Sequence, residues 1–179
     1  MYPTPDALHA AAWRILARGV ADRRHPARNP ALATIGTDGP RVRTVVLRAW
    51  RDGIAEIHTD KATDKVAEIT ADPRVALHVW VPRARLQIRL TGTASLVFGD
   101  RMRWQAVPEG ARQHYGGDTP PGQPIRAPGD FAAVPDPERF TVVDIACSAA
   151  DILHLGDDFY RRVRSTRQGD AWRTAWVAP

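Results

Sequence analysis

The sequence has one cysteine and no long apolar run, and each shortage excludes a class of protein. Cys147 is the only cysteine among 179 residues, so neither an internal disulfide nor a cysteine-based zinc site can form within one chain. No apolar run approaches the roughly 20 residues that cross a bilayer. Asp6, His9 and Arg14 interrupt the region where a secretion signal needs an apolar segment. We therefore expect a cytoplasmic protein without a membrane partner.

Four short motifs that mark common enzyme classes are also missing. The chain contains no His-Glu-x-x-His, no Gly-x-Ser-x-Gly, no Gly-x-x-x-x-Gly-Lys and no Gly-x-Gly-x-x-Gly. The sequence therefore gives no motif evidence for a zinc protease, a serine hydrolase, a nucleotide triphosphatase or a Rossmann dehydrogenase.

Lysine is scarce although the chain is basic. The net charge is +5 and the isoelectric point is near 10.1, yet only Lys61 and Lys65 are lysines. The arginines are scattered over the whole chain instead of forming a block with interleaved aromatic residues. We therefore predict no nucleic-acid partner and interpret most of the arginines as solvated surface.

The composition is that of an ordinary globular protein, with 44% hydrophobic and 25% charged residues. The length predicts a single domain over residues 1–179. Thr4 and Pro5 are typical of a helix start and Gly19 of a helix end, so residues 1–19 form a predicted N-terminal helix. Residues 108–137 are crowded with proline and glycine and predict a long loop, typical of a binding lid or a mobile segment.

The rest of the chain has the short periods and turn signals of strands. In the run from Leu86, Gln87 and Arg89 alternate with apolar residues, which predicts one core face and one polar face. A short helix is predicted after Thr63, with Val66 and Ile69 pointing inward. These runs predict a mainly β protein, a β-barrel with peripheral helices. The predicted strands are residues 32–35, 42–50, 54–58, 75–81, 86–96, 140–146, 151–155, 159–166 and 171–177.

Several cationic and hydroxyl side chains in the first half have the chemistry of a phosphate site. Arg43 supplies a planar fork and Lys65 a point charge, while Thr63 supplies a hydroxyl beside the amide donors of a helix start. Arg43 and Arg48 would point to opposite faces of a regular strand. A bulge, or a ligand lying across the end of the strand, would reconcile them.

A family resemblance rests on motifs in the same part of the chain. In order and spacing they resemble the flavin-binding half of the pyridoxamine 5'-phosphate oxidase family, with residues 28–98 matching and residues 169–179 similar to that family's C-terminus. The motifs are Arg43–Arg48, His58–Thr59, Thr63–Lys65, Asp72–Leu77 and Leu86–Ile88.

The resemblance implies a six-stranded antiparallel split barrel of Greek-key type. It also implies a homodimer with two sites for flavin mononucleotide (FMN) at the subunit interface. Arg43 and Lys65 would contact the phosphate with help from Thr59 and Thr63, whereas Arg48 and Gln87 would lie near the flavin ring. The implied cofactor-binding residues are Arg43, Thr44, Val45, Val46, Arg48, His58, Thr59, Thr63, Lys65, Gln87 and Arg162.

The chain departs from the vitamin-oxidising members of that family. Arg48 stands where lysine is usual, His58 where an aromatic residue such as tyrosine is usual, and Asp64 where arginine is usual. The Arg-Leu-His substrate motif is replaced by Asp157-Asp158-Phe159-Tyr160. The groups that hold pyridoxal phosphate are therefore missing from their usual position.

We therefore expect an FMN-dependent oxidoreductase that transfers hydride between a small-molecule substrate and flavin N5. Two alternatives stay open. A true pyridoxamine or pyridoxine phosphate oxidase is possible if Arg161, Arg162 or Arg126 replaces the missing motif. The other is a non-enzymatic flavin- or haem-binding protein, with His78 and His154 as candidate haem ligands.

Overall fold

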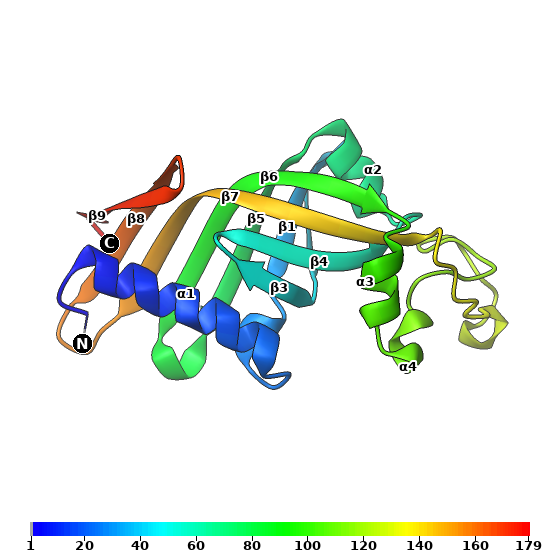
Figure 1. Ribbon diagram of the computed structural model, residues 1–179, viewed down its shortest axis with the longest axis horizontal. Coiled ribbons are helices and arrows are strands. Elements are labelled where there is room, and N and C mark those ends of the chain that lie inside the picture. The colour runs from blue at the N-terminus through cyan, green and yellow to red at the C-terminus, as the bar shows by residue number, and fades with distance from the viewer. Residues whose placement is uncertain (1) are drawn as a thin grey trace.

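The computed structural model describes residues 2–179 as a curved antiparallel sheet with helices at its margins (Figure 1). The mainly β architecture predicted from the sequence is confirmed. No helix in the described residues is both long and apolar enough to span a bilayer. The α-helices are α1 (Pro5–Ala21), α2 (Asp64–Ala71), α3 (Arg101–Ala106) and α4 (Glu109–Arg112), and the 3-10 turns are η1 (Pro26–Arg28), η2 (Pro82–Ala84) and η3 (Pro128–Asp130).

The described residues form nine strands in one sheet, not the six that the family resemblance implies. The main path runs β2-β1-β5-β6-β7-β4-β3, with β8 beside β7 and β9 beside β8. Within the described chain β2 and β3 each pair with one strand only, so the sheet does not close on itself. The strands are β1 (Ala31–Gly36), β2 (Gly39–Thr44), β3 (Leu47–Arg51), β4 (Ile54–Asp60), β5 (Arg74–Val81), β6 (Leu86–Phe98), β7 (Phe140–Leu155), β8 (Tyr160–Gln168) and β9 (Ala171–Val177).

Helix α1 begins where the sequence predicts but ends later. The Thr4 side chain accepts a hydrogen bond from the Ala7 amide at 3.2 Å, and Pro5 takes the first helical position. Gly19 does not end the helix, which continues to Ala21. A side chain at Gly19 would collide with the backbone of Ala27. This glycine therefore permits close packing between α1 and η1 and is not a stop signal.

The predicted strand over residues 42–50 is two strands. The chain leaves the sheet between Thr44 and Leu47, where the Val45 amide donates to the Pro30 carbonyl at 2.9 Å. Strand β2 pairs with β1 while β3 pairs with β4, near opposite ends of the sheet path. The β-branched pair Val45-Val46 thus joins the two ends of the strand order, which a local propensity reading cannot detect.

Conversely, the predicted strands 140–146 and 151–155 are one strand, β7. A bulge places Ser148 as an extra residue, since Gly92 pairs with Cys147 and Thr91 with Ala149. At its start β7 lies between β4 and β6, and beyond the bulge it lies between β6 and β8. The strand therefore belongs to both halves of the sheet.

Two apolar clusters hold these layers together. The main core joins α1, through Leu8 and Leu16, to inward side chains such as Ile57 and Ile88. A smaller cluster around Phe140 covers the other face of β4 and β7 with residues from α3 and the segment after it. This double cover explains the nearly continuous burial of both strands.

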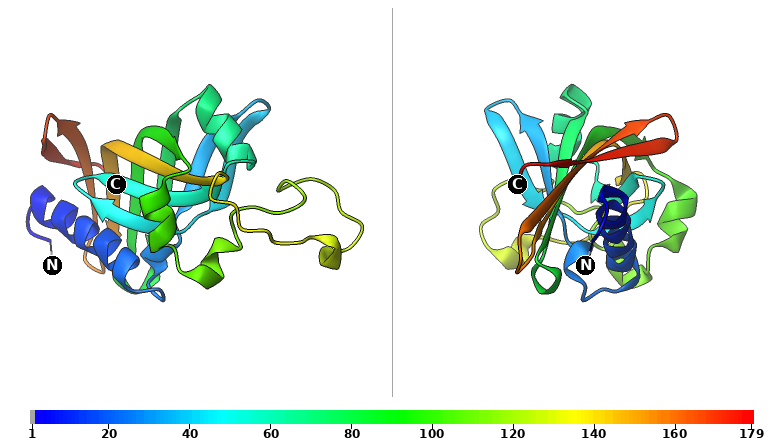
Figure 2. Two further views of the ribbon diagram at one scale, coloured as in Figure 1. Left: turned by 45° about the vertical axis from the view of Figure 1, so that its right-hand side comes forward. Right: turned by 90° about the vertical axis from the view of Figure 1, so that its left-hand side faces the viewer.

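The predicted loop over residues 108–137 contains α4 and η3 and is anchored at both ends. Asp60 accepts hydrogen bonds from the Gly116 amide at 2.7 Å and from Arg139 Nε at 3.1 Å. Between these anchors the chain extends away from the sheet, drawn yellow-green in Figure 2. The base of the segment therefore packs on the protein body, while its tip projects.

Candidate functional site

Three of the predicted phosphate ligands meet at the N-terminus of α2. Lys65 Nζ donates to Thr59 Oγ1 at 3.0 Å, and the Thr59 and Thr63 hydroxyls lie 3.2 Å apart. Thr63 occupies the predicted cap position, but its hydroxyl donates to the Asp60 carbonyl at 2.7 Å and makes no cap hydrogen bond. Strand β4 thus delivers one hydroxyl and the helix start delivers a second hydroxyl and an ammonium group.

Arg43 reaches the same region from β2. Its guanidinium donates to the Thr34 hydroxyl and forms an ion pair with Glu68 of α2 at 2.6 Å. Only 23% of the Arg43 side chain and 11% of the Glu68 side chain are exposed. Lys65 and Glu68 are three residues apart on α2, so the helix presents both to the space in front of Arg43.

The charge of Arg43 acts on Lys65. The pKa of Lys65 is lowered, first by burial and then by the positive charge of Arg43, against the opposing effect of nearby carboxylates. Burial would raise the pKa of Glu68, but hydrogen bonds from Thr34 and Arg43 outweigh it and lower the pKa. An anion placed here would relieve the repulsion between Lys65 and Arg43.

The residues predicted to lie near the flavin ring follow Arg43 in the sequence, but their surroundings differ. Thr44 is exposed, Val45 is buried and Val46 is half-buried in the crossing between β2 and β3. Arg48, on β3, donates to the Tyr115 hydroxyl at 3.3 Å. Its Nε is buried and lacks a hydrogen-bond partner among the described residues. A buried guanidinium nitrogen without a partner is costly unless a ligand supplies an acceptor.

His58 does not join Thr59. Neighbouring residues on a strand point to opposite faces, and the ring of His58 packs edge-on against Phe140 at 4.9 Å in the smaller apolar cluster. His58 Nε2 lies 2.8 Å from Glu56 Oε1. Burial is the main cause that lowers the pKa of His58, against the raising effect of its hydrogen bond with Glu56.

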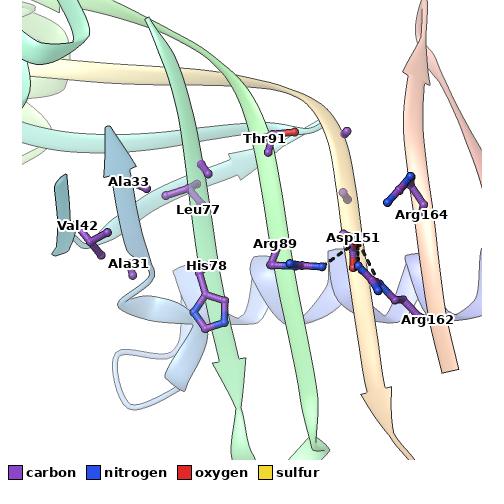
Figure 3. A pocket seen from close by; sticks show the side chains of 13 residues that line it. Ala31, Ala33, Val42, Leu77, His78, Arg89, Thr91, Asp151, Arg162 and Arg164 are labelled. Carbon is purple, nitrogen blue, oxygen red and sulfur yellow. Dashed lines mark hydrogen bonds and ion pairs between the residues drawn. The ribbon is translucent and has the colours of Figure 1, made fainter. Parts of the chain in front are cut away.

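The strand register puts Gln87 and Arg162 on a third surface, the open face of the sheet, where Figure 3 shows Arg162 beside Asp151. Leu153 of β7 pairs with both residues, so the three side chains form one row across β6, β7 and β8. Asp151, one row away, binds Arg162 at 2.8 Å and Arg89 at 3.0 Å. Burial raises the pKa of Asp151, but these hydrogen bonds outweigh it and lower the pKa.

This face is hollowed into a pocket of about 570 Å³, which reaches from β2 to β8. Ala31 and Ala33 of β1 line it, whereas Thr34 points to the other face, where it bonds Arg43. Arg43 and Arg162 therefore belong to opposite faces of the sheet. In one chain, the predicted ligands form three groups and not a single cavity.

Sequence reasoning missed three residues that support these groups. Glu68 was detectable in principle, because it stands one helical turn after Lys65. Tyr115 and the anchoring carboxylate of Asp60 gave no signal, because their contacts join segments far apart in the sequence. Among the described residues, no cluster of three or more His, Cys, Asp or Glu side chains could hold a metal ion.

Comparison with known proteins places the chain in a family. Residues 10–98 match the family model described as pyridoxamine 5'-phosphate oxidase, FMN-binding domain. The crystal structure of a pyridoxamine 5'-phosphate oxidase-related, FMN-binding protein from Nostoc punctiforme PCC 73102 is 25% identical over the whole of both chains, with a TM-score of 0.80. The chain belongs to the pyridoxamine 5'-phosphate oxidase-related family.

Other structures share the fold of this family at lower identity. PhzG from Burkholderia lata 383, in complex with tetrahydrophenazine-1-carboxylic acid, is 21% identical over 99% of this chain and 94% of its own, with a TM-score of 0.74. A heme-binding protein from Mycobacterium smegmatis is 18% identical over 84% of this chain and 57% of its own, with a TM-score of 0.51. No match was found among curated proteins.

As a member of the pyridoxamine 5'-phosphate oxidase-related family, the chain has residues whose environments fit FMN. The paired cations Arg43 and Lys65 have the chemistry that a phosphate requires. The unpartnered Arg48 Nε is a donor suited to a flavin carbonyl or ring nitrogen. The two candidate haem ligands are placed differently. His78 is exposed on β5, and the ring of His154 packs against the ring of Tyr2, with 5.1 Å between the ring centroids.

Proposed function

We propose that the protein is an FMN-dependent oxidoreductase that acts on a small molecule. The observation that carries this proposal is the meeting of Arg43 and Lys65 beside the N-terminus of α2. Both cations are partly buried there; Glu68 pairs with Arg43, and the charges of Glu68, Asp60 and Asp64 act on Lys65. A phosphate monoester would gain charge-assisted hydrogen bonds from both, each contributing about 1.5 to 3 kcal/mol. Thr59 and Thr63 would supply hydroxyl donors, with the first amides of α2 beside them.

Arg48 would hold the ring end of the cofactor. When bound, FMN supplies the chemistry itself, since its N5 exchanges hydride with the substrate. The chain's task is to orient the ring and to stabilise negative charge on it. Arg48 is suited to this because its charge is permanent. The Tyr115 hydroxyl, at 3.3 Å, fixes the direction of the guanidinium.

We further propose that a homodimer completes the site. Gln87 and Arg162 lie on the open sheet face, separate from the Arg43 group. A second copy packed against this face would cover the pocket of about 570 Å³ and exclude water from the flavin ring. Cys147 is buried, which raises the pKa of its thiol to about 12, so it is unreactive. A single inert thiol fits the reducing cytoplasm, where we place the activity.

A true vitamin B6 oxidase is a less favoured function. Two of the three cations considered as replacements for the missing substrate motif already have carboxylate partners. Arg161 binds Asp158 at 2.7 Å and Arg162 binds Asp151 at 2.8 Å. A phosphate substrate would have to displace these carboxylates, and Asp158 would repel it.

The decisive experiment is an FMN titration followed by anaerobic reduction. We expect the purified protein to bind FMN with quenching of flavin fluorescence, and the complex to be reduced by NADH or NADPH. A protein that fails to take up FMN contradicts the proposal. Tight FMN binding without reduction by either donor would favour a non-enzymatic flavin carrier, and oxygen consumption with pyridoxamine phosphate would establish the vitamin oxidase.

A further inference from the structure

A second cationic site lies on the other side of the molecule, between α1 and η2. A groove of about 1000 Å³ runs between one flank of α1, the start of η1 and the η2 turn. In Figure 1 this turn is the green loop that joins β5 to β6 below the sheet, beside α1. Its walls carry five basic residues, Arg14, Arg18, Arg24, His25 and Arg83. None of them belongs to the proposed flavin site.

The groove is amphipathic in a defined way. Ala11 and Val81 are buried and Ile15 is half-buried, so they form an apolar floor. The arginines that rise from the walls are exposed. Arg14 and Arg18 are one helical turn apart on α1 and face the groove together, with Arg83 on the opposite wall.

These arginines differ from most others in the protein because they have no acidic partner. Within residues 2–179, no ion pair or side-chain hydrogen bond involves the guanidinium of Arg14, Arg18, Arg24 or Arg83. Asp22 is the only carboxylate that lines the groove, and it accepts a hydrogen bond from the backbone amide of Arg24 at 2.9 Å. The groove therefore keeps an uncompensated positive charge.

That charge acts on its neighbours. Burial lowers the pKa of His25, and the positive charge of Arg18 lowers it further. Like charges four residues apart on a helix also destabilise it, by about 0.2 to 0.5 kcal/mol. An arrangement that costs stability in the free protein is relieved when an anion enters the groove.

We propose that this groove binds an organic phosphate with at least two negative charges. Guanidinium forks on both walls match phosphate oxygens, and the apolar floor suits the organic body of such a ligand. The volume is that of a small-molecule site. A nucleic acid would need aromatic stacking platforms along an extended track. Tyr2 is the only aromatic side chain that lines the groove, and it is half-buried.

The test uses ADP, inorganic pyrophosphate and adenosine as probes on the FMN-saturated protein, measured by calorimetry. We expect ADP and pyrophosphate to bind and adenosine to bind at least about tenfold more weakly than ADP, because the phosphates supply the charge-assisted bonds. The double variant Arg14→Gln/Arg18→Gln should weaken ADP binding by at least about tenfold. Arg83→Gln, on the opposite wall, should weaken it too.

The matched control is Arg101→Gln/Arg173→Gln, which removes the same charge from exposed positions outside the groove. We expect it to bind ADP within about twofold of the parent, since distant surface charges are screened. Equal losses in both double variants would overturn the proposal, as would equal binding of adenosine and ADP or no ADP binding. Tighter binding of a DNA duplex than of ADP, lost in the groove variant, would also overturn it. FMN binding is measured in the same samples, so failure here is distinct from failure of the proposed flavin site.

Discussion

The α2 cluster and the α1–η2 groove both gather cations, but they hold them differently. In the α2 cluster Arg43 is partly buried and bonded to Thr34 and Glu68, and Lys65 is bonded to Thr59. In the groove Arg14, Arg18 and their neighbours are exposed and have no carboxylate partner. The first arrangement fixes side chains before a ligand arrives, whereas the second leaves them free.

This difference has consequences for affinity and selectivity. Fixed donors lose little conformational entropy on binding and discriminate by geometry. Mobile, hydrated arginines lose more entropy and act mainly through charge, which salt screens. We therefore expect a selective site for one cofactor at α2 and a more tolerant anion site at the groove.

The largest expected effect comes from removing both fixed cations. Arg43→Gln/Lys65→Gln should weaken FMN binding by at least about 100-fold, because two charge-assisted bonds of about 1.5 to 3 kcal/mol each are lost. Fluorescence titration measures this, with Arg101→Gln/Arg173→Gln as the control of equal charge. An FMN affinity equal to that of the control would remove the proposed phosphate site.

The next effect tests whether the α2 cluster is held together by its carboxylate. Glu68→Ala should lower the free energy of unfolding by about 1 to 3 kcal/mol, since Arg43 and Thr34 lose a partly buried acceptor. Asp38→Ala is the matched control, because Asp38 pairs with Arg41 on the surface with 82% of its side chain exposed. Its cost should be below about 1 kcal/mol. Urea denaturation measures the free energy of unfolding of both variants. An equal loss in the two would contradict the view that Glu68 holds the α2 cluster together.

Salt should weaken binding at the two sites to different extents, and this difference is smaller than the effects of the substitutions. Raising sodium chloride from about 50 mM to about 500 mM should weaken ADP binding at the groove by about tenfold, but FMN binding by less than about threefold, because exposed charges are screened more than partly buried ones. Parallel titrations of one protein preparation give both values. The opposite order of sensitivity would mean that the α2 cluster is the more solvated site.

The last prediction concerns protonation and involves little free energy. Burial and Arg43 lower the pKa of Lys65, so its ammonium should lose its proton at a lower pH than an ordinary lysine. A bound phosphate dianion favours the charged form and should raise that pKa. Only two lysines are present, so carbon NMR of the lysine side chains gives two signals, and Lys61→Arg assigns them. A Lys65 signal that does not respond to FMN would contradict a phosphate contact.

The local periodicity of the sequence was sufficient to predict much of the sheet. The alternation that begins at Leu86 correctly separated the buried and polar faces of β6. The start of α2 and its inward residues Val66 and Ile69 were also predicted correctly. These features depend on neighbours within a few residues, which a sequence pattern records.

The predicted strand boundaries are wrong where contacts between segments far apart in the sequence determine the structure. Val45-Val46 looks like the middle of a strand, yet the chain crosses there between two sheet edges. The small residues around Ser148 look like a break between strands, yet they form a bulge inside one. For the candidate site, the sequence indicated which cations to consider. Strand alternation implies that His58 and Thr59 face opposite ways, although both were predicted as ligands, whereas no local pattern indicates that Tyr115 reaches Arg48.

The position of strand β7 in the sequence delays the assembly of the sheet. It is the neighbour of β4 on one edge and of β6 on the other, yet it is translated after both. Until Leu155 has left the ribosome, β4 and β6 each keep an edge with unsatisfied backbone groups, and such edges pair readily with other chains. The central pairing of the sheet is therefore completed only after residues 99–155 have been made, and β4 and β6 are exposed to wrong pairing until then.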